Sequence, residues 1–287
     1  MALDAKELGA LLDELLEAWD TDGRPTVLRQ RRAKGNRKLS TFDLALMWCV
    51  LGLTHHVHET ARSIKLLVDA GHYNSAIPLV RAVYECALTA VWLAQSKDDD
   101  AVKAYLHEHS RQRYWTSAHM KRAVVATFRE NASKVADVDM SMFAGSQDKA
   151  GKFDKLCDDL TPGGAEAYTL YRILSSLSHA GVGVVDLYWY APTSDSDLPR
   201  ARPKPRRALS TDVLLFLTAD SMVWSGRAVS YLSKNNSYRS VLRDVARQLE
   251  ITSEIQLSEV YHKRHPVSRK KRAAASASQP PTASRRT

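Results

Sequence analysis

The chain has 287 residues and a formal net charge of +9, with 44% hydrophobic and 25% charged residues. This balance is typical of a soluble globular protein. No apolar run reaches the roughly 18 residues that a membrane span needs, and the acidic N-terminus excludes a secretory signal peptide. The three cysteines are far apart without disulfide or zinc spacing, which predicts reduced thiols and a cytoplasmic protein: Cys49, Cys86 and Cys157.

The positive charge is concentrated at the C-terminus. Residues 263–287 hold eight Lys and Arg and no acid, which leaves 33 bases against 32 acids in the remaining body. We therefore expect polyanion contact through residues 263–287. Two further basic clusters, Arg24–Lys38 and Arg200–Arg207, lie in stretches with Pro or Gly and are predicted to be loops. They are interpreted either as solvated loops or as nucleic-acid contacts.

The first half of the chain predicts long helices. Residues 4–19 place leucines and a tryptophan on one helical stripe, and a capping box at Ser40 opens a helix that runs to about Ala70. Gly71 ends it, and a second long helix runs from residue 74 or 75 to Gln95, with Pro78 in its first turn. The short connection predicts an antiparallel helix hairpin.

The second half of the chain is also predicted to be mainly helical. We expect helices from about residue 98 to 117 or 131, over 153–160, from the Pro162-Gly163-Gly164 turn to Gly181, from about 210 to 235, over 238–249 and over 251–261. Residues 182–190 are predicted to form a short extended segment, for which no partner strand is evident. Residues 192–208 are predicted to form an exposed loop. The fold class is all-α. We expect three regions in the chain: a helix and basic loop over residues 1–39, a helical bundle over 40–261, and a disordered basic tail over 262–287.

One segment, YRILSSLSHAG at 171–181, combines an apolar stripe with a pair of polar candidates. The predicted buried stripe comprises Leu170, Ile173, Leu174 and Leu177. Arg172 and His179 lie seven positions apart, so an uninterrupted helix would bring them to nearly the same face. His179 would then occupy the last helical turn, where backbone carbonyls favour its protonated form. Arg113 and His119 have a similar spacing without this context.

The segment ARSIKLLVDAGHYNSAIPLVRAVYECALTAVWLA, followed downstream by YRILSSLSHAG, resembles bacterial helical proteins that carry only a domain-of-unknown-function label and resemble the HEPN superfamily. The resemblance covers roughly residues 40–235 and implies a HEPN-like bundle. Many HEPN proteins are metal-independent endoribonucleases of toxin or phage-defence type, with an Arg followed after four to six residues by His. The resemblance therefore implies that Arg172 and His179 are catalytic and that RNA is a partner. It also implies that the protein forms a homodimer and uses no cofactor.

Alternatives remain beside this interpretation. Ile173 follows Arg172 where active HEPN members often carry a polar residue, and the pair could instead be structural within a noncatalytic helical interaction module with a basic tail. Arg81 and Glu85 have helical i,i+4 spacing and either fix helix packing or line the Arg172 pocket. A cluster on the first long helix, of which the i,i+4 pair His55 and Glu59 could share a metal, provides only a weak metal pattern, so no metal site is predicted; its members are His55, His56, His58 and Glu59.

Overall fold

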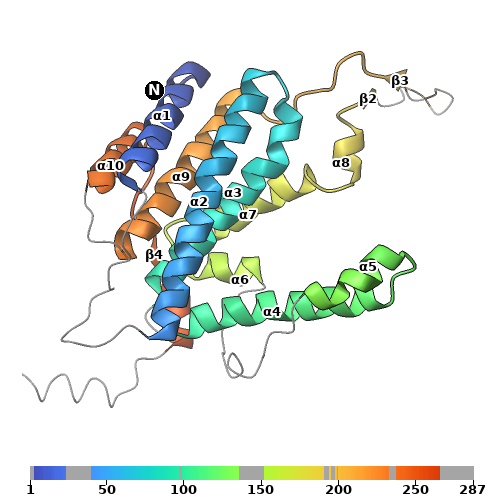
Figure 1. The fold of residues 1–287 in the computed structure, drawn as a ribbon. Coiled ribbons are helices and arrows are strands. Elements are labelled where there is room, and N and C mark those ends of the chain that lie inside the picture. The colour runs from blue at the N-terminus through green and yellow to red at the C-terminus, as the bar shows by residue number, and fades with distance from the viewer. Residues whose placement is uncertain are drawn as a thin grey trace, which may run out of the picture.

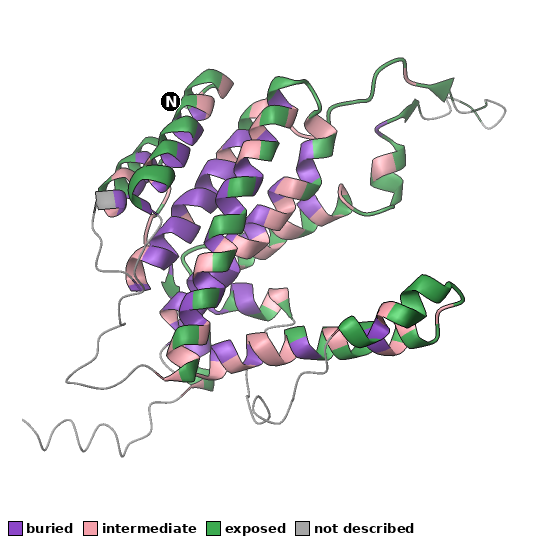
Figure 2. Cartoon of the chain, viewed as in Figure 1, coloured by how far each residue is buried: buried purple, intermediate pink, exposed green. Residues whose placement is uncertain are grey.

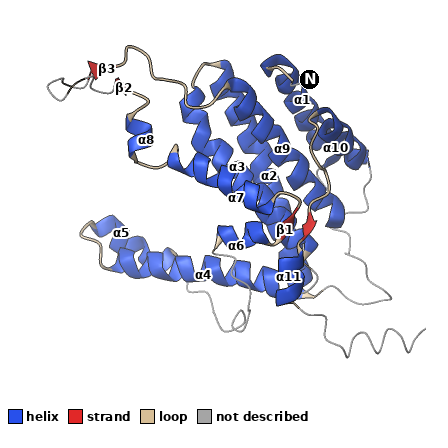
Figure 3. Ribbon diagram, turned by 180° about the vertical axis from the view of Figure 1, so that it is seen from behind, coloured by secondary structure: helices blue, strands red, loops and turns tan. Residues whose placement is uncertain are grey.

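The computed structural model describes residues 3–23, 40–96, 99–135, 152–190, 194, 198, 200–232 and 237–265. The predicted basic loop at 24–38 and nearly all of the predicted tail lie outside the described residues. Within the described part, the fold is mostly helical, and its four two-residue strands form two small antiparallel pairs (Figures 1 and 3). The prediction of an all-α fold is confirmed.

The centre of the bundle is formed by three long helices, α2 (Thr41–Asp69), α3 (Tyr73–Gln95) and α9 (Thr211–Leu232), which pack against one another. The capping box predicted at Ser40 is present, because its Oγ accepts from Asp43 N at 3.0 Å and Asp43 accepts from Ser40 N at 2.8 Å. Gly71, with φ of +80°, makes the turn into α3. Helices α2 and α3 are joined by this short turn and pack against each other, and α3 begins one or two residues earlier than expected, which places Pro78 in its second turn.

The other helices cover this centre. On one side, α1 (Ala5–Ala18) and α10 (Ser237–Gln248) pack against α9, which is buried along most of its length (Figure 2). The π-helical turn η1 (Trp19–Gly23) packs against α1 and α10. On another side, α6 (Phe153–Asp158) and α7 (Gly164–Ser176) pack against α3. Helix α4 (Asp100–Lys121) extends away from the bundle, and α5 (Ala126–Asn131) and the 3-10 turn η2 (Ala132–Lys134) fold back on it (Figure 1).

Three predictions for the second half need correction. The segment predicted as a helix over 251–261 contains strand β4 (Gln256–Leu257), which pairs with β1 (Leu160–Thr161), and α11 then runs over Glu259–Arg264. The segment 182–190, predicted to be extended, begins instead with the one-turn helix α8 (Val182–Val185). Only its last two residues, β2 (Trp189–Tyr190), are paired, with β3 (Arg200–Ala201) inside the predicted loop. Pairing between two segments is invisible to the local periodicity of either one, which explains why the strand pairs were not predicted.

The basic end of the described chain is anchored rather than free. Arg264, the last residue of α11, donates to the buried carboxylate of Asp159, which also accepts a hydrogen bond from Trp92 Nε1 at 3.0 Å. Residues 263–265 therefore belong to the bundle, and the boundary predicted at 261 moves to at least 265.

Within the described residues, α3 is the one helix long and apolar enough to cross a membrane by length and composition. Two thirds of that apolar window, 67%, is buried inside the bundle. Its apolar character is therefore accounted for by its place between α2, α7 and α9.

Candidate functional site

Helix α7 carries the residues singled out in the sequence, and its start is fixed by two glycines. Gly163 has φ of +91°, a left-handed conformation that side chains disfavour. At Gly164 a Cβ would lie only 2.2 Å from the carbonyl oxygen of Cys157, so the turn requires a residue without a side chain. This close approach to α6 sets the direction in which α7 runs along α3.

Arg81 of α3 links the hairpin to α7. Its Nε donates to Ser175 Oγ at 2.9 Å, and its Nη2 donates to Tyr171 Oη at 2.5 Å. The guanidinium carbon also lies 4.8 Å from the centre of the Tyr171 ring. The two α7 partners are four residues apart and therefore share one helix face.

Glu85 completes this polar cluster from the next turn of α3. Its Oε2 lies 3.3 Å from Arg81 Nη2, as the i,i+4 spacing predicted. Burial raises the pKa of the Glu85 carboxyl, and the positive charge of Arg81 opposes that rise. The Arg81 guanidinium is thus shared among three partners, and its side chain is 22% exposed. Through its hydrogen bonds to Tyr171 and Ser175, Arg81 holds α7 against α3.

Arg172, four residues before the end of α7, and His179, three residues after it, are both exposed. The helix ends at Ser176, so His179 lies in the following turn, where its N–H donates to the carbonyl of Ser175 at 3.1 Å. The prediction that His179 occupies the last helical turn is therefore wrong, and so is the helical argument for a shared face. The predicted buried stripe also fails at Ile173, which is 46% exposed.

A basic and aromatic surface continues from this end of α7. It runs along α8, β2, β3 and the segment 200–207, which lie beyond the end of α7 in Figure 1. The segment is held by backbone hydrogen bonds from Arg202 N to Tyr188 O at 2.8 Å and from Arg206 N to Leu187 O at 2.7 Å. Its exposed aromatic residues are Tyr188, Trp189 and Tyr190, and its basic residues are Arg200, Arg202, Lys204, Arg206 and Arg207.

The arginines of this surface are ordered by cation–π contacts. Arg202 lies 4.2 Å and Arg200 5.9 Å from the Tyr190 ring centre, and Arg207 lies 3.6 Å from that of Tyr73. The amide of Asn74 further ties the segment to α3 through Arg206 O at 2.9 Å. The basic cluster was visible in the sequence, but its partners were not. A signal for these aromatic partners was present in the sequence, as a Tyr-Trp-Tyr run ten residues before the arginine-rich stretch.

Among the described residues, no group of three or more metal-ligating side chains gathers at the histidines of α2. His58 is buried and stacks on Trp19 at 4.3 Å between ring centres. Its Nδ1 lies 2.9 Å from the carbonyl oxygen of Thr54, so Nδ1 carries the proton and Nε2 accepts from Tyr238 Oη at 2.8 Å. His58 is therefore a packing residue.

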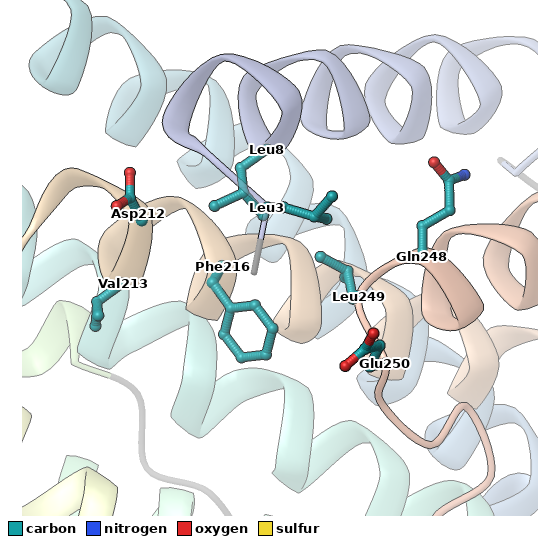
Figure 4. Close-up of a pocket in the computed structure, with 8 residues that line it drawn as sticks. All are labelled: Leu3, Leu8, Asp212, Val213, Phe216, Gln248, Leu249 and Glu250. Carbon is teal, nitrogen blue, oxygen red and sulfur yellow. The ribbon is translucent and has the colours of Figure 1, made fainter. Parts of the chain in front are cut away.

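A cavity of about 310 Å³ lies on another side of the bundle, between α1, α9 and the end of α10 (Figure 4). Its apolar walls include Leu3, Leu8 and Phe216, while the polar Asp212 and Glu250 are both exposed to solvent. It shares none of its residues with the surface around Arg172.

The chain was compared with known protein families, curated proteins and solved structures. A family model described as a family of unknown function (DUF5677) matches residues 47–195, just over half of the chain. The chain is a member of the DUF5677 family. No curated protein and no solved structure matches it. The DUF5677 region contains Arg81, Glu85, Arg172 and His179, whereas α9 and the segment 200–207 lie beyond it.

Proposed function

We propose that this DUF5677 protein is a HEPN-like RNA-binding protein that cleaves single-stranded RNA without a metal ion, using Arg172 and His179. The observation that carries the proposal is that both residues are solvent-exposed, Arg172 in the C-terminal half of α7 and His179 in the turn that follows it. A pair sealed in the core could not reach an RNA phosphate. An exposed Arg and His without structural partners among the described residues are free to do so.

The neighbouring surface supports RNA as the substrate. Single-stranded nucleic acids are bound by basic groups that follow the phosphates and by aromatic rings on which bases stack. The segment 200–207 and the aromatic residues at 188–190 supply both kinds of group beside α8, which begins three residues after His179. A strand bound along this surface would extend toward the end of α7.

The two side chains have complementary roles in this proposal. The guanidinium of Arg172 holds the phosphate at which cleavage occurs and stabilises its developing charge. His179 assists attack of the ribose 2′-oxygen on phosphorus, either by accepting the 2′-hydroxyl proton or by protonating the departing 5′-oxygen. The products would be a 2′,3′-cyclic phosphate and a 5′-hydroxyl. The resemblance also implies a homodimer in which two copies complete one site, and an effector of toxin or phage-defence type.

The test is RNA cleavage by purified protein, together with growth and RNA integrity in bacteria that express it. We expect Arg172→Ala and His179→Ala each to abolish cleavage, and Arg172→Lys to do the same, because an ammonium cannot reproduce the bidentate grip of a guanidinium. Chelators should have no effect. Arg113→Ala and His119→Ala are the matched controls, because these residues have similar spacing on α4 and should retain full cleavage.

A noncatalytic interaction module is the second candidate. It is favoured by the placement of Arg172 within α7 and His179 outside it, with no hydrogen bond between them. RNA binding that persists without any cleavage, and that weakens on replacement of Arg200, Arg202 and Lys204, would support this candidate. Cleavage that survives in both alanine variants would overturn the catalytic assignment.

A further inference from the structure

A second cavity, of about 300 Å³, lies at the opposite end of α7 from His179. It opens between α3, α7, α9 and the connection that follows α10. Its apolar lining comes mainly from Leu88, Leu160, Ala167, Leu170, Phe216, Leu217, Ile251 and Ile255. The cavity therefore has the size and apolar walls of a small-molecule site.

Asp220, in the middle of α9, lines this cavity with a buried carboxyl. The residue is only 4% exposed, and its Oδ1 has no hydrogen-bond partner among the described residues. Buried carboxyl groups are normally paired, because removing one from water without compensation is costly. Asp220 therefore lacks a partner that a bound molecule would supply.

The groups around Asp220 indicate the charge of that molecule. Glu166, in the first turn of α7, is the other carboxylate of the lining, and the lining contains no lysine, arginine or histidine. An anion would meet two carboxyl groups, whereas a cation would be attracted by both. Burial raises the pKa of the Asp220 carboxyl well above its usual value, and an adjacent positive charge would oppose that rise.

Two aromatic side chains provide a wall for the rest of such a ligand. Tyr84 and Trp224 pack with ring centres 5.9 Å apart, and both line the cavity. Trp224 is held in place by its Nε1–H, which donates to Thr252 O at 3.0 Å. Aromatic faces attract ammonium groups and pack well against apolar bodies.

We propose that this cavity binds a small organic amine, with its ammonium group on Asp220 and its apolar body against Tyr84 and Trp224. Glu166 adds a second negative charge at the start of α7. A divalent metal is a poorer match, since two carboxylates are too few ligands for a protein-held site. The site is independent of RNA cleavage, and its test does not depend on that activity.

The experiment compares matched pairs of probes by isothermal titration calorimetry with the full chain. The amines are 2-phenylethylamine, tryptamine and hexylamine, and the corresponding alcohols are 2-phenylethanol, tryptophol and hexanol. Each pair differs only in its charged group. We expect at least one amine to bind at least tenfold more tightly than its alcohol. If no amine binds more tightly than its alcohol, the proposal is overturned.

Variants locate the binding. Asp220→Asn should weaken amine binding at least tenfold and leave alcohol binding unchanged, and Glu166→Gln should weaken it by a smaller factor. Asp212→Asn, which alters an exposed carboxylate at the start of the same helix, should bind amines like the unaltered protein. Equal amine binding by Asp220→Asn and the unaltered chain would overturn the assignment. Should Asp220→Asn fail to fold, Glu166→Lys is the decisive variant, because it reverses a surface charge and should abolish the preference for amines.

Discussion

Two buried polar residues of the central helices, His58 of α2 and Asp220 of α9, differ in their hydrogen bonding. His58, where α2 meets η1 and α10, uses both ring nitrogens and stacks on Trp19. Asp220, where α9 faces α3 and α7, lies in a cavity with an unpaired carboxyl oxygen. A satisfied buried group specifies packing, whereas an unsatisfied one costs stability. The first region is therefore expected to respond to mutation through stability and the second through binding.

The largest effect on stability is expected for His58→Ala. It removes a stacked ring and leaves Tyr238 Oη without its His58 partner, while the Thr54 carbonyl loses one of its two hydrogen bonds, which should lower the free energy of unfolding by about 3 kcal/mol or more. Chemical denaturation followed by circular dichroism measures this loss. His56→Ala, at an exposed position of the same helix, should change it by less than about 0.5 kcal/mol. Similar values for the two variants would show that the His58 cluster does not stabilise the fold.

The same residue predicts acid sensitivity. Burial lowers the pKa of His58 to about 3 from its ordinary 6.5, so the folded protein excludes a proton that the unfolded chain accepts. Its contribution to stability is present above pH 6.5 and is lost as the pH falls toward 3, by about 1.4 kcal/mol per pH unit. Denaturation between pH 7 and pH 4 should therefore show a smaller acid loss in His58→Ala than in the unaltered chain.

The opposite sign is expected for Asp220→Asn, which should raise the free energy of unfolding by about 2 kcal/mol at pH 7. The pKa of Asp220 is raised in the folded state, so its contribution is greatest below the ordinary 3.8 and falls as the pH rises toward the raised pKa. The advantage of the variant should therefore grow with pH over that range. Tyr84 and Glu166 are the other titratable groups of this cavity and are unchanged in the variant. A loss of stability at pH 7 would show that the carboxyl is paired after all.

An intermediate effect is expected for Arg81→Ala, which removes the hydrogen bonds from α3 to Tyr171 and Ser175. We expect a loss of about 1–2 kcal/mol in the free energy of unfolding, since these contacts are half-buried. The matched control is Arg62→Ala on the neighbouring helix α2, because it breaks an exposed ion pair with Asp20 of η1 and should cost less than about 1 kcal/mol. An Arg81 variant no less stable than the control would remove its role in holding α7.

The smallest effect on stability is expected at Arg172 and His179, although their effect on RNA cleavage is proposed to be complete. Both are exposed and without side-chain partners among the described residues, so alanine at either position should change the free energy of unfolding by less than about 0.5 kcal/mol. Thermal denaturation of both variants measures this. A loss of several kcal/mol would instead assign the pair a structural role.

Local chemistry in the sequence determined the long helices of the first half and the two ends of α2. The capping box at Ser40, the apolar periodicity of the long helices and the glycine after α2 act within a few residues of themselves, so their consequences could be predicted. The i,i+4 pair of Arg81 and Glu85 follows from the same local geometry. The sequence also identified Arg172 and His179 as candidates, and their roles stay predictions.

Only the tertiary structure decided what those residues meet. It ends α7 at Ser176, pairs β1 with β4 and β2 with β3, and turns Arg81 toward Tyr171 and Ser175. It also places Asp220 in a cavity lined by residues from four separate segments, although nothing in its local pattern distinguishes it from a surface aspartate of α9. The physical reason is that hydrogen bonding and desolvation depend on neighbours brought together by folding, whereas helix periodicity and capping depend on neighbours in the chain.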